Sequence, residues 1–153
     1  MNSLRRKDRE IPLQDAIKII DDAEYGVLST VDKGGHPYGV PLSFVFNNYA
    51  IYFHCAVTGL KLENIANNSK ASFCVVGSTN VLPDKFGTEY ESAIAFGNVS
   101  EIQGSEKNDA LVWLLEKYCA EFLHEGLQYI ESKDKATKVF KMEISHISGK
   151  ARK

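Results

Sequence analysis

The sequence predicts an α+β protein that is mainly β and is built on an antiparallel sheet or a small barrel. About six segments are rich in β-branched and aromatic residues, and most of them are joined by short turns, with few helices between them. The regular alternation of strand and helix that is typical of a Rossmann fold is absent, and so is the motif G-x-G-x-x-G.

Composition narrows the class of protein further. A chain of 153 residues predicts a single domain, residues 1–153, with a sizeable core. Its net charge of -2 disfavours nucleic acid or an anionic membrane as a partner. No run approaches the ~18 apolar residues that span a bilayer, and the charged residues 1–10 do not resemble a signal peptide. Three cysteines without C-x-x-C spacing indicate a reduced, cytoplasmic protein with no metal site.

The first third of the chain predicts a solvated basic arm over residues 1–10, a helix ending near Asp22, and two strands. The strands are residues 25–31 and 36–46, joined by a turn at 32–35. In the second strand, apolar residues alternate with the small or polar residues Gly39, Pro41 and Ser43. Because proline cannot donate a backbone hydrogen bond, Pro41 indicates an edge strand, a bulge or a ligand, and the small face leaves room for a flat molecule.

The next segment predicts an anion site. Asn47-Asn48 is expected to turn the chain into a strand over residues 49–56, and a helix ending near residues 67–68 follows at once through Thr58-Gly59. The first N–H groups of a helix are unpaired and lie at the positive end of its dipole, so they attract phosphate. Lys61 in the first turn would add a positive charge, although a solvated lysine at an ordinary helix start is the alternative.

The second half predicts three more strands and two helical segments. The strands are residues 71–77, 89–102 and 137–147, with a loop over 81–88 and a basic tail over 148–153. A long helix is expected to be capped by Ser105 and to extend its apolar face to Phe122. Trp113 lies off that face and is expected to be exposed or to meet a second subunit. Gly126 is expected to break the pattern before a short helix over 127–132.

Eight motifs in this order resemble one family along nearly the whole chain: residues 5–10, 26–30, 37–43, 53–56, 61–65, 72–77, 95–97 and 147–152. They are similar to the 5-nitroimidazole-resistance (Nim-type) branch of the pyridoxamine 5′-phosphate oxidase-like, FMN-binding split-barrel proteins. The resemblance implies a six-stranded antiparallel split β-barrel flanked by helices. It also implies a homodimer with FMN held between the subunits.

The resemblance also implies a set of cofactor-binding residues. The flavin ring would lie against Tyr38, Gly39, Val40, Pro41, Leu42 and Ser43, and would be bordered by His54 and Ala56 with Phe53 and Cys55 on the same strand. The phosphate would lie at Thr58, Gly59 and Lys61, and Asn64 would bind it or the ribityl chain. Lys150 of the basic tail would reach the partner's site. One departure is Leu60, which stands where the family pattern usually has histidine, and it weakens the implied nitroreduction.

Three functions follow from this resemblance. The first is a flavin-dependent oxidoreductase that passes electrons from NAD(P)H to a small acceptor such as a 5-nitroimidazole, with His54 as the candidate catalytic residue for proton delivery. The second is a non-catalytic protein that stores or senses FMN, a deazaflavin or haem, for which His36, His54, His124 and His146 are possible axial ligands. A pyridoxamine-phosphate-oxidase-like enzyme is disfavoured, because Lys61 has no basic neighbours to bind a substrate phosphate.

Overall fold

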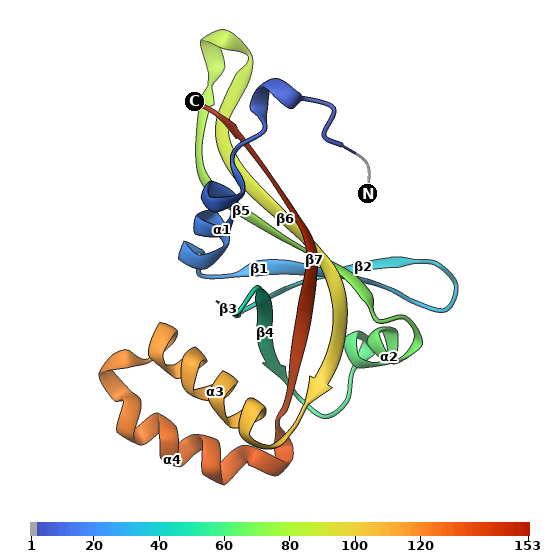
Figure 1. Ribbon diagram of the computed structural model, residues 1–153, viewed down its shortest axis with the longest axis vertical. Helices are drawn as coiled ribbons and strands as arrows, with labels where there is room; N and C mark the ends of the chain where they lie inside the picture. The colour runs from blue at the N-terminus through green and yellow to red at the C-terminus, as the bar shows by residue number, and fades with distance from the viewer. Residues whose placement is uncertain (1–2) are drawn as a thin grey trace.

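The computed structural model describes residues 3–153, and within them the strands form one antiparallel sheet in the order β2-β1-β5-β6-β7-β4-β3 (Figure 1). Its strands are β1 (Gly26–Val31), β2 (Pro37–Leu42), β3 (Val45–Asn47), β4 (Ala50–Cys55), β5 (Lys70–Leu82), β6 (Gly87–Ile102) and β7 (Lys138–Arg152). The sheet is open, with β2 and β3 at its two edges. The predicted α+β split-barrel class is confirmed, with seven strands in the described residues where six were expected.

The seventh strand arises because the predicted strand over residues 36–46 is divided. β2 pairs with β1, whereas β3 pairs with β4 at the opposite edge of the sheet. Ser43 and Phe44 lie between them, so one short segment carries the chain from one edge to the other. Alternation of side chains continues through this break, which is why sequence alone indicates a single strand.

Two turns differ from the sequence-based expectation. The β3–β4 hairpin turns at Asn48 and Tyr49, both in the left-handed region with φ of 50° and 58°, and Asn47 is the last residue of β3. The predicted loop over residues 81–88 is mostly strand, because β5 and β6 pair out to Leu82 and Gly87. Only the single 3-10 turn Pro83–Lys85 separates them, and the hairpin extends well beyond the body of the sheet (Figure 1).

Neither end of the described chain is a free tail. The expected basic tail is the last part of β7, which pairs with β6 as far as Arg152. At the other end, the N–H of Ile11 donates to the carbonyl of Gly149 at 3.2 Å, and the backbone of Glu10 forms an isolated antiparallel β-bridge with that of Lys150. Residues 1–2 of the predicted arm lie outside the described residues, but the rest of it leads directly onto β7.

Two hydrophobic clusters lie on the two faces of the sheet. The larger includes Phe44, Phe53 and Phe73 and is covered by α1 (Leu13–Asp22), whose bounds agree with the prediction. The smaller lies under α3 (Gly104–Tyr118) and includes Tyr52 and Leu114. Within the described residues no helix is long and apolar enough to cross a membrane.

The helices α3 and α4 correct four sequence-based expectations. Ser105 lies inside α3, whose N-terminus has no side-chain cap, and Phe122 is exposed beyond the end of α3. Trp113 is not exposed, as one expectation had it, but partly buried, because its ring packs edge-on against Tyr52 with centroids 5.3 Å apart. Helix α4 (Leu123–Lys133) continues through Gly126 and is not broken there. A side chain at this position would collide with Leu115 of α3. The glycine therefore permits close helix packing.

The crossing segment is held by the C-terminal end of α3. The Tyr118 hydroxyl accepts the N–H of Phe44 at 3.0 Å, and its own proton lies within hydrogen-bonding distance of the carbonyls of Phe44 and Glu24. Lys117 donates to the same Phe44 carbonyl at 2.9 Å, with its Nζ 3.9 Å from the centroid of the Phe44 ring. Burial lowers the pKa of Lys117, opposed by the charges of Asp21 and Asp22.

We expect Tyr118→Phe to lower the free energy of unfolding by about 1–3 kcal/mol, because it removes the only side-chain acceptor that the N–H of buried Phe44 has among the described residues. Urea denaturation of the two proteins measures this. Tyr25→Phe, at a tyrosine whose side chain is 62% exposed, is the matched control and should change little. Equal losses in the two variants would show that the hydroxyl does not hold the crossing segment.

Candidate functional site

The corner between β4 and α2 (Leu60–Asn67) has the geometry of an anion site. Gly59 precedes the helix with a φ of 145°, which side-chain-bearing residues rarely adopt, so the glycine permits the abrupt turn. No side chain caps the N-terminus of α2. The N–H groups of the first helical turn have no carbonyl partner within the helix, and they remain available to an anion beside exposed Thr58.

Lys61 lies over the end of β4. Its side chain is half-buried, and its Nζ is 5.7 Å from the centroid of the Phe53 ring. Its charge also acts on two neighbours. Partial desolvation first, and then Lys61, lower the pKa of His54, whereas burial raises the pKa of the Cys55 thiol against the opposite effect of Lys61. The ammonium group therefore lies close to the strand and not out in bulk solvent.

The two faces of β4 separate the residues that the sequence placed together. Phe53 is fully buried and stacks on Phe140 with ring centroids 5.7 Å apart, so only its backbone could contact a cofactor, and its role in binding stays a prediction. Cys55 lies on the same face and packs against the same cluster. His54 lies on the opposite face, toward α3, and Ala56 is exposed beyond the end of the strand.

His54 lies at a cavity of about 360 Å³ between β4 and the α3–α4 hairpin. The cavity is mostly apolar, with walls formed by leucines of α3 and by Tyr129 and Ile130 of α4, and Ser43 contributes at its edge. A lowered pKa keeps His54 neutral at neutral pH. A neutral imidazole can donate one hydrogen bond and accept another, and this favours ligand positioning over the predicted proton delivery.

β2 presents its small residues outward, as its sequence pattern indicates. Tyr38, Gly39 and Pro41 are exposed along an edge strand, while Val40 and Leu42 turn inward and pack against the larger cluster. Val40 and Leu42 can therefore offer a ligand mainly backbone atoms. The edge position also explains the proline, since the N–H that it lacks is not needed on the unpaired side of a sheet.

Asn64 connects the helix corner to the exposed strand. Its side chain is 1% exposed, and its Nδ2 donates to Oγ1 of Thr30 at 3.1 Å. Thr30 of β1 is paired with Tyr38 of β2, so this hydrogen bond fixes α2 beside the first residues of β2. The predicted phosphate corner therefore lies next to the first residues of β2, whereas Gly39 and Pro41 pair with Ser29 and Val27 and face the other side of the sheet from Thr30.

Lys150 is not brought to this site by its own chain. The residue of β7 opposite Cys55 is Lys138, and Lys150 lies near the far end of β7, paired with Ser92. At about 3.3 Å per residue, a straight strand would separate Lys138 from Lys150 by roughly 40 Å. Within one chain, Lys150 and Lys61 therefore belong to different regions.

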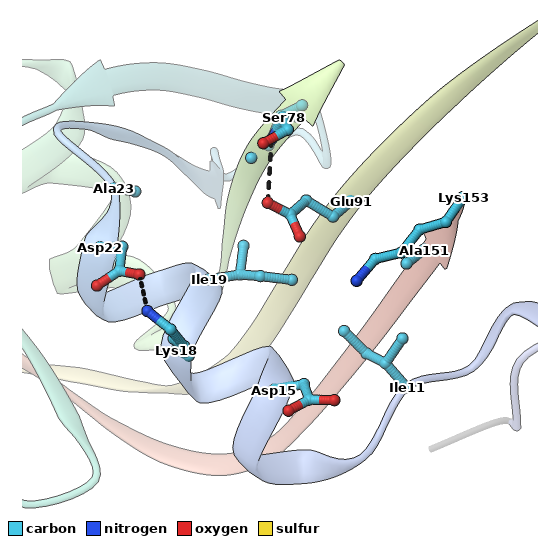
Figure 2. A pocket seen from close by; sticks show the side chains of 12 residues that line it. Ile11, Asp15, Lys18, Ile19, Asp22, Ala23, Ser78, Glu91, Ala151 and Lys153 are labelled. Atoms are coloured by element: carbon cyan, nitrogen blue, oxygen red, sulfur yellow. Dashed lines mark hydrogen bonds and ion pairs between the residues drawn. The ribbon is translucent and has the colours of Figure 1, made fainter. Parts of the chain in front are cut away.

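The largest of the cavities found among the described residues was not anticipated from the sequence. It measures about 530 Å³ and lies between α1, the β5–β6 hairpin and the C-terminal residues (Figure 2). Lys18 pairs with Asp22 on one side, and Glu91 accepts the N–H of Ser78 on the other. Its residues come from four separate segments with no local motif, so no sequence signal could have indicated it.

Comparison with known proteins places the chain in a family. The sequence profile described as pyridoxamine 5′-phosphate oxidase matches residues 13–151. No curated protein matches at the sequence level.

Solved structures share the fold at low identity. A candidate 5-nitroimidazole antibiotic resistance protein from Bacteroides thetaiotaomicron is 23% identical with a TM-score of 0.74, covering 92% of this chain and 85% of its own. An FAD-binding protein from Mesorhizobium loti is 20% identical with a TM-score of 0.68, covering 95% and 98%. The FAD and heme binding protein from Mycobacterium smegmatis is 18% identical with a TM-score of 0.71, covering 95% and 74%. The profile match over most of the chain, together with this shared fold, shows that the protein belongs to the pyridoxamine 5′-phosphate oxidase family.

Proposed function

We propose that this protein binds FMN and acts as a flavin-dependent oxidoreductase, passing electrons from NAD(P)H to a small acceptor such as a 5-nitroimidazole. The observation that carries the proposal is the uncapped N-terminus of α2, where Gly59 and Lys61 form a cationic corner. Asn64 of the same helix is hydrogen-bonded to Thr30, the strand partner of Tyr38 in β2. Proteins of the same fold that bind FAD, or FAD and heme, support a flavin over an unrelated anion.

The residues at this corner fit FMN. Thr58, the first N–H groups of α2 and Lys61 would hold the phosphate, and Asn64 is already fixed next to them. The planar ring would lie along the edge strand β2 and the residue that follows it, from Tyr38 to Ser43. When bound, FMN supplies the redox chemistry, and the protein binds it, orients it and sets its surroundings.

Two residues bear on how this protein would carry out the reaction, and one of them, Leu60, departs from the family pattern. Leu60 is 47% exposed at the anion corner and offers no hydrogen bond where histidine is usual, so the phosphate depends more strongly on Lys61. Neutral His54 would orient an acceptor through a hydrogen bond from the opposite face of β4.

We also propose a cytoplasmic homodimer. The flavin surface on β2 is open in one chain, and Lys150 is too far along β7 to reach its own corner. The extended β5–β6 hairpin exposes Val81 and Phe86, the latter with 97% of its surface, as an apolar arm that suits a second copy.

Among the described residues the cysteines are all free, in agreement with a reducing compartment.

Haem binding is the second candidate. His54 borders a mostly apolar cavity, a setting in which imidazole serves as an axial ligand. The absorption spectrum of the purified protein distinguishes the two cofactors. A flavin spectrum that NADH or NADPH bleaches and a nitroimidazole restores supports the oxidoreductase. A Soret band supports haem in its place.

Lys61→Ala should weaken FMN binding by about 10- to 100-fold, the effect of one charge-assisted hydrogen bond of ~1.5–3 kcal/mol. Riboflavin, which lacks the phosphate, should lose little. Flavin fluorescence titration of the apoprotein measures both affinities, with Lys70→Ala at the exposed start of β5 as the control. Equal losses for FMN and riboflavin would contradict the phosphate assignment.

Sedimentation equilibrium should give twice the mass of one chain. Phe86→Ser on the exposed arm should shift the protein toward the monomer and weaken FMN binding in parallel, because the second subunit completes the site. Phe122→Ser, at another exposed phenylalanine, should leave the mass unchanged. A wild-type monomer that binds FMN would overturn the dimer proposal.

The pKa of His54 should lie below 6.5 and should rise in Lys61→Ala, because a nearby positive charge opposes protonation. Titration of the imidazole by NMR measures it, again with Lys70→Ala as the control. Because the folded-state pKa of His54 lies below its unfolded value, His54 contributes to the free energy of unfolding above pH ~6.5. This contribution is lost as the pH falls through the folded-state pKa. In His54→Gln, the free energy of unfolding should therefore fall less steeply on acidification.

A further inference from the structure

The cavity beside His54 is a pocket with defined walls on two sides. It is bounded by Leu111, Leu114 and Leu115 of α3 on one side and by Ile130 and Tyr129 of α4 on the other. Helices α3 and α4 form a hairpin (Figure 1), and Leu115 of α3 occupies the space that a side chain at Gly126 of α4 would need. A volume of about 360 Å³ lies within the range of small-molecule sites.

Helix α4 supplies apolar surface that the protein itself does not use. None of its residues is buried, and Tyr129, which lines the cavity, is 64% exposed. Ile130 is only partly buried, against the edge of the smaller hydrophobic cluster. A helix whose apolar residues line a cavity without filling it leaves that area for a ligand to cover.

The polar groups of the pocket select the kind of ligand. The rings of Tyr118, Tyr129 and His54 offer faces or edges to a flat molecule, and the Tyr118 hydroxyl is already engaged by the backbone of Phe44. His54 is neutral near pH 7, and Ser43 and Thr137 are uncharged. Lys133 is the only charged lining residue and is exposed, so its ammonium group can remain in water.

We propose that this pocket binds a small, uncharged, planar aromatic molecule, held between the leucines of α3 and the Tyr129–Ile130 wall of α4 and hydrogen-bonded by His54. Ser43, which lines this pocket, directly follows β2, where the flavin ring is proposed to lie. The occupant is therefore the electron acceptor of the oxidoreductase, an assignment that rests on the proposed function.

Isothermal titration calorimetry of the cofactor-free protein with indole tests the pocket directly. Indole should bind saturably, and indole-3-carboxylate should bind at least about tenfold more weakly, because burying a carboxylate among leucines is costly. Ile130→Trp should abolish indole binding by filling the space, whereas Leu123→Trp, on the same helix outside the cavity, should retain it. No saturable indole binding, or equal binding of the two probes, would overturn the proposal.

A second pair of variants covers the case in which Ile130→Trp does not fold. Tyr129→Ala removes one exposed wall and should weaken indole binding about two- to tenfold, the typical value of one aromatic contact. Tyr25→Ala, at a similarly exposed tyrosine away from the cavity, should not. Unchanged affinity in Tyr129→Ala would exclude this pocket as the site.

Measuring FMN affinity on the same samples separates this inference from the proposed function. Ile130→Trp should bind FMN as the wild type does, since Ile130 is not part of the flavin surface. Indole binding without FMN binding would leave the pocket standing and refute the flavoprotein. FMN binding without indole binding would refute the pocket alone.

Discussion

The backbone of Phe44 is the point on which the architecture depends. Here the chain leaves β2 at one edge of the sheet and joins β3 at the other, so Phe44 has no strand partner, although its side chain is fully buried. Tyr118 and Lys117 satisfy its N–H and carbonyl from the end of α3. A buried backbone group without a partner costs about 1–3 kcal/mol, so the helix end and the crossing segment stabilise each other.

This arrangement also positions the candidate sites. The crossing residue Ser43 lies at the cavity beside His54, and β2 immediately before it carries the exposed Gly39 and Pro41. The hydrogen bond from Asn64 to Thr30 fixes the helix corner next to Tyr38, at the start of β2. Moving the crossing segment would therefore disturb the proposed ring surface and the proposed acceptor pocket together.

β4 divides the chemistry between its two faces. Phe53 and Cys55 face the core under the Lys61 ammonium group, while His54 faces the apolar pocket under α3 and α4. A flavin along β2 with its phosphate at α2 would thus meet a cationic corner at one end. The uncharged cavity lies on the opposite face of β4. Because β4 separates the two environments, this one short strand can serve both an anionic cofactor and a neutral acceptor.

The class of fold, α1, the strand-to-helix corner at Gly59 and the exposed small residues of β2 could be predicted from the amino-acid sequence, because local residue patterns indicate them. Tertiary structure decided what local pattern cannot contain. The division of residues 36–46 follows from pairing with two distant strands, and the helical role of Gly126 follows from its contact with Leu115. The β-strand period shows that the side chains of Phe53 and His54 face opposite ways, but only packing shows that Phe53 faces the core.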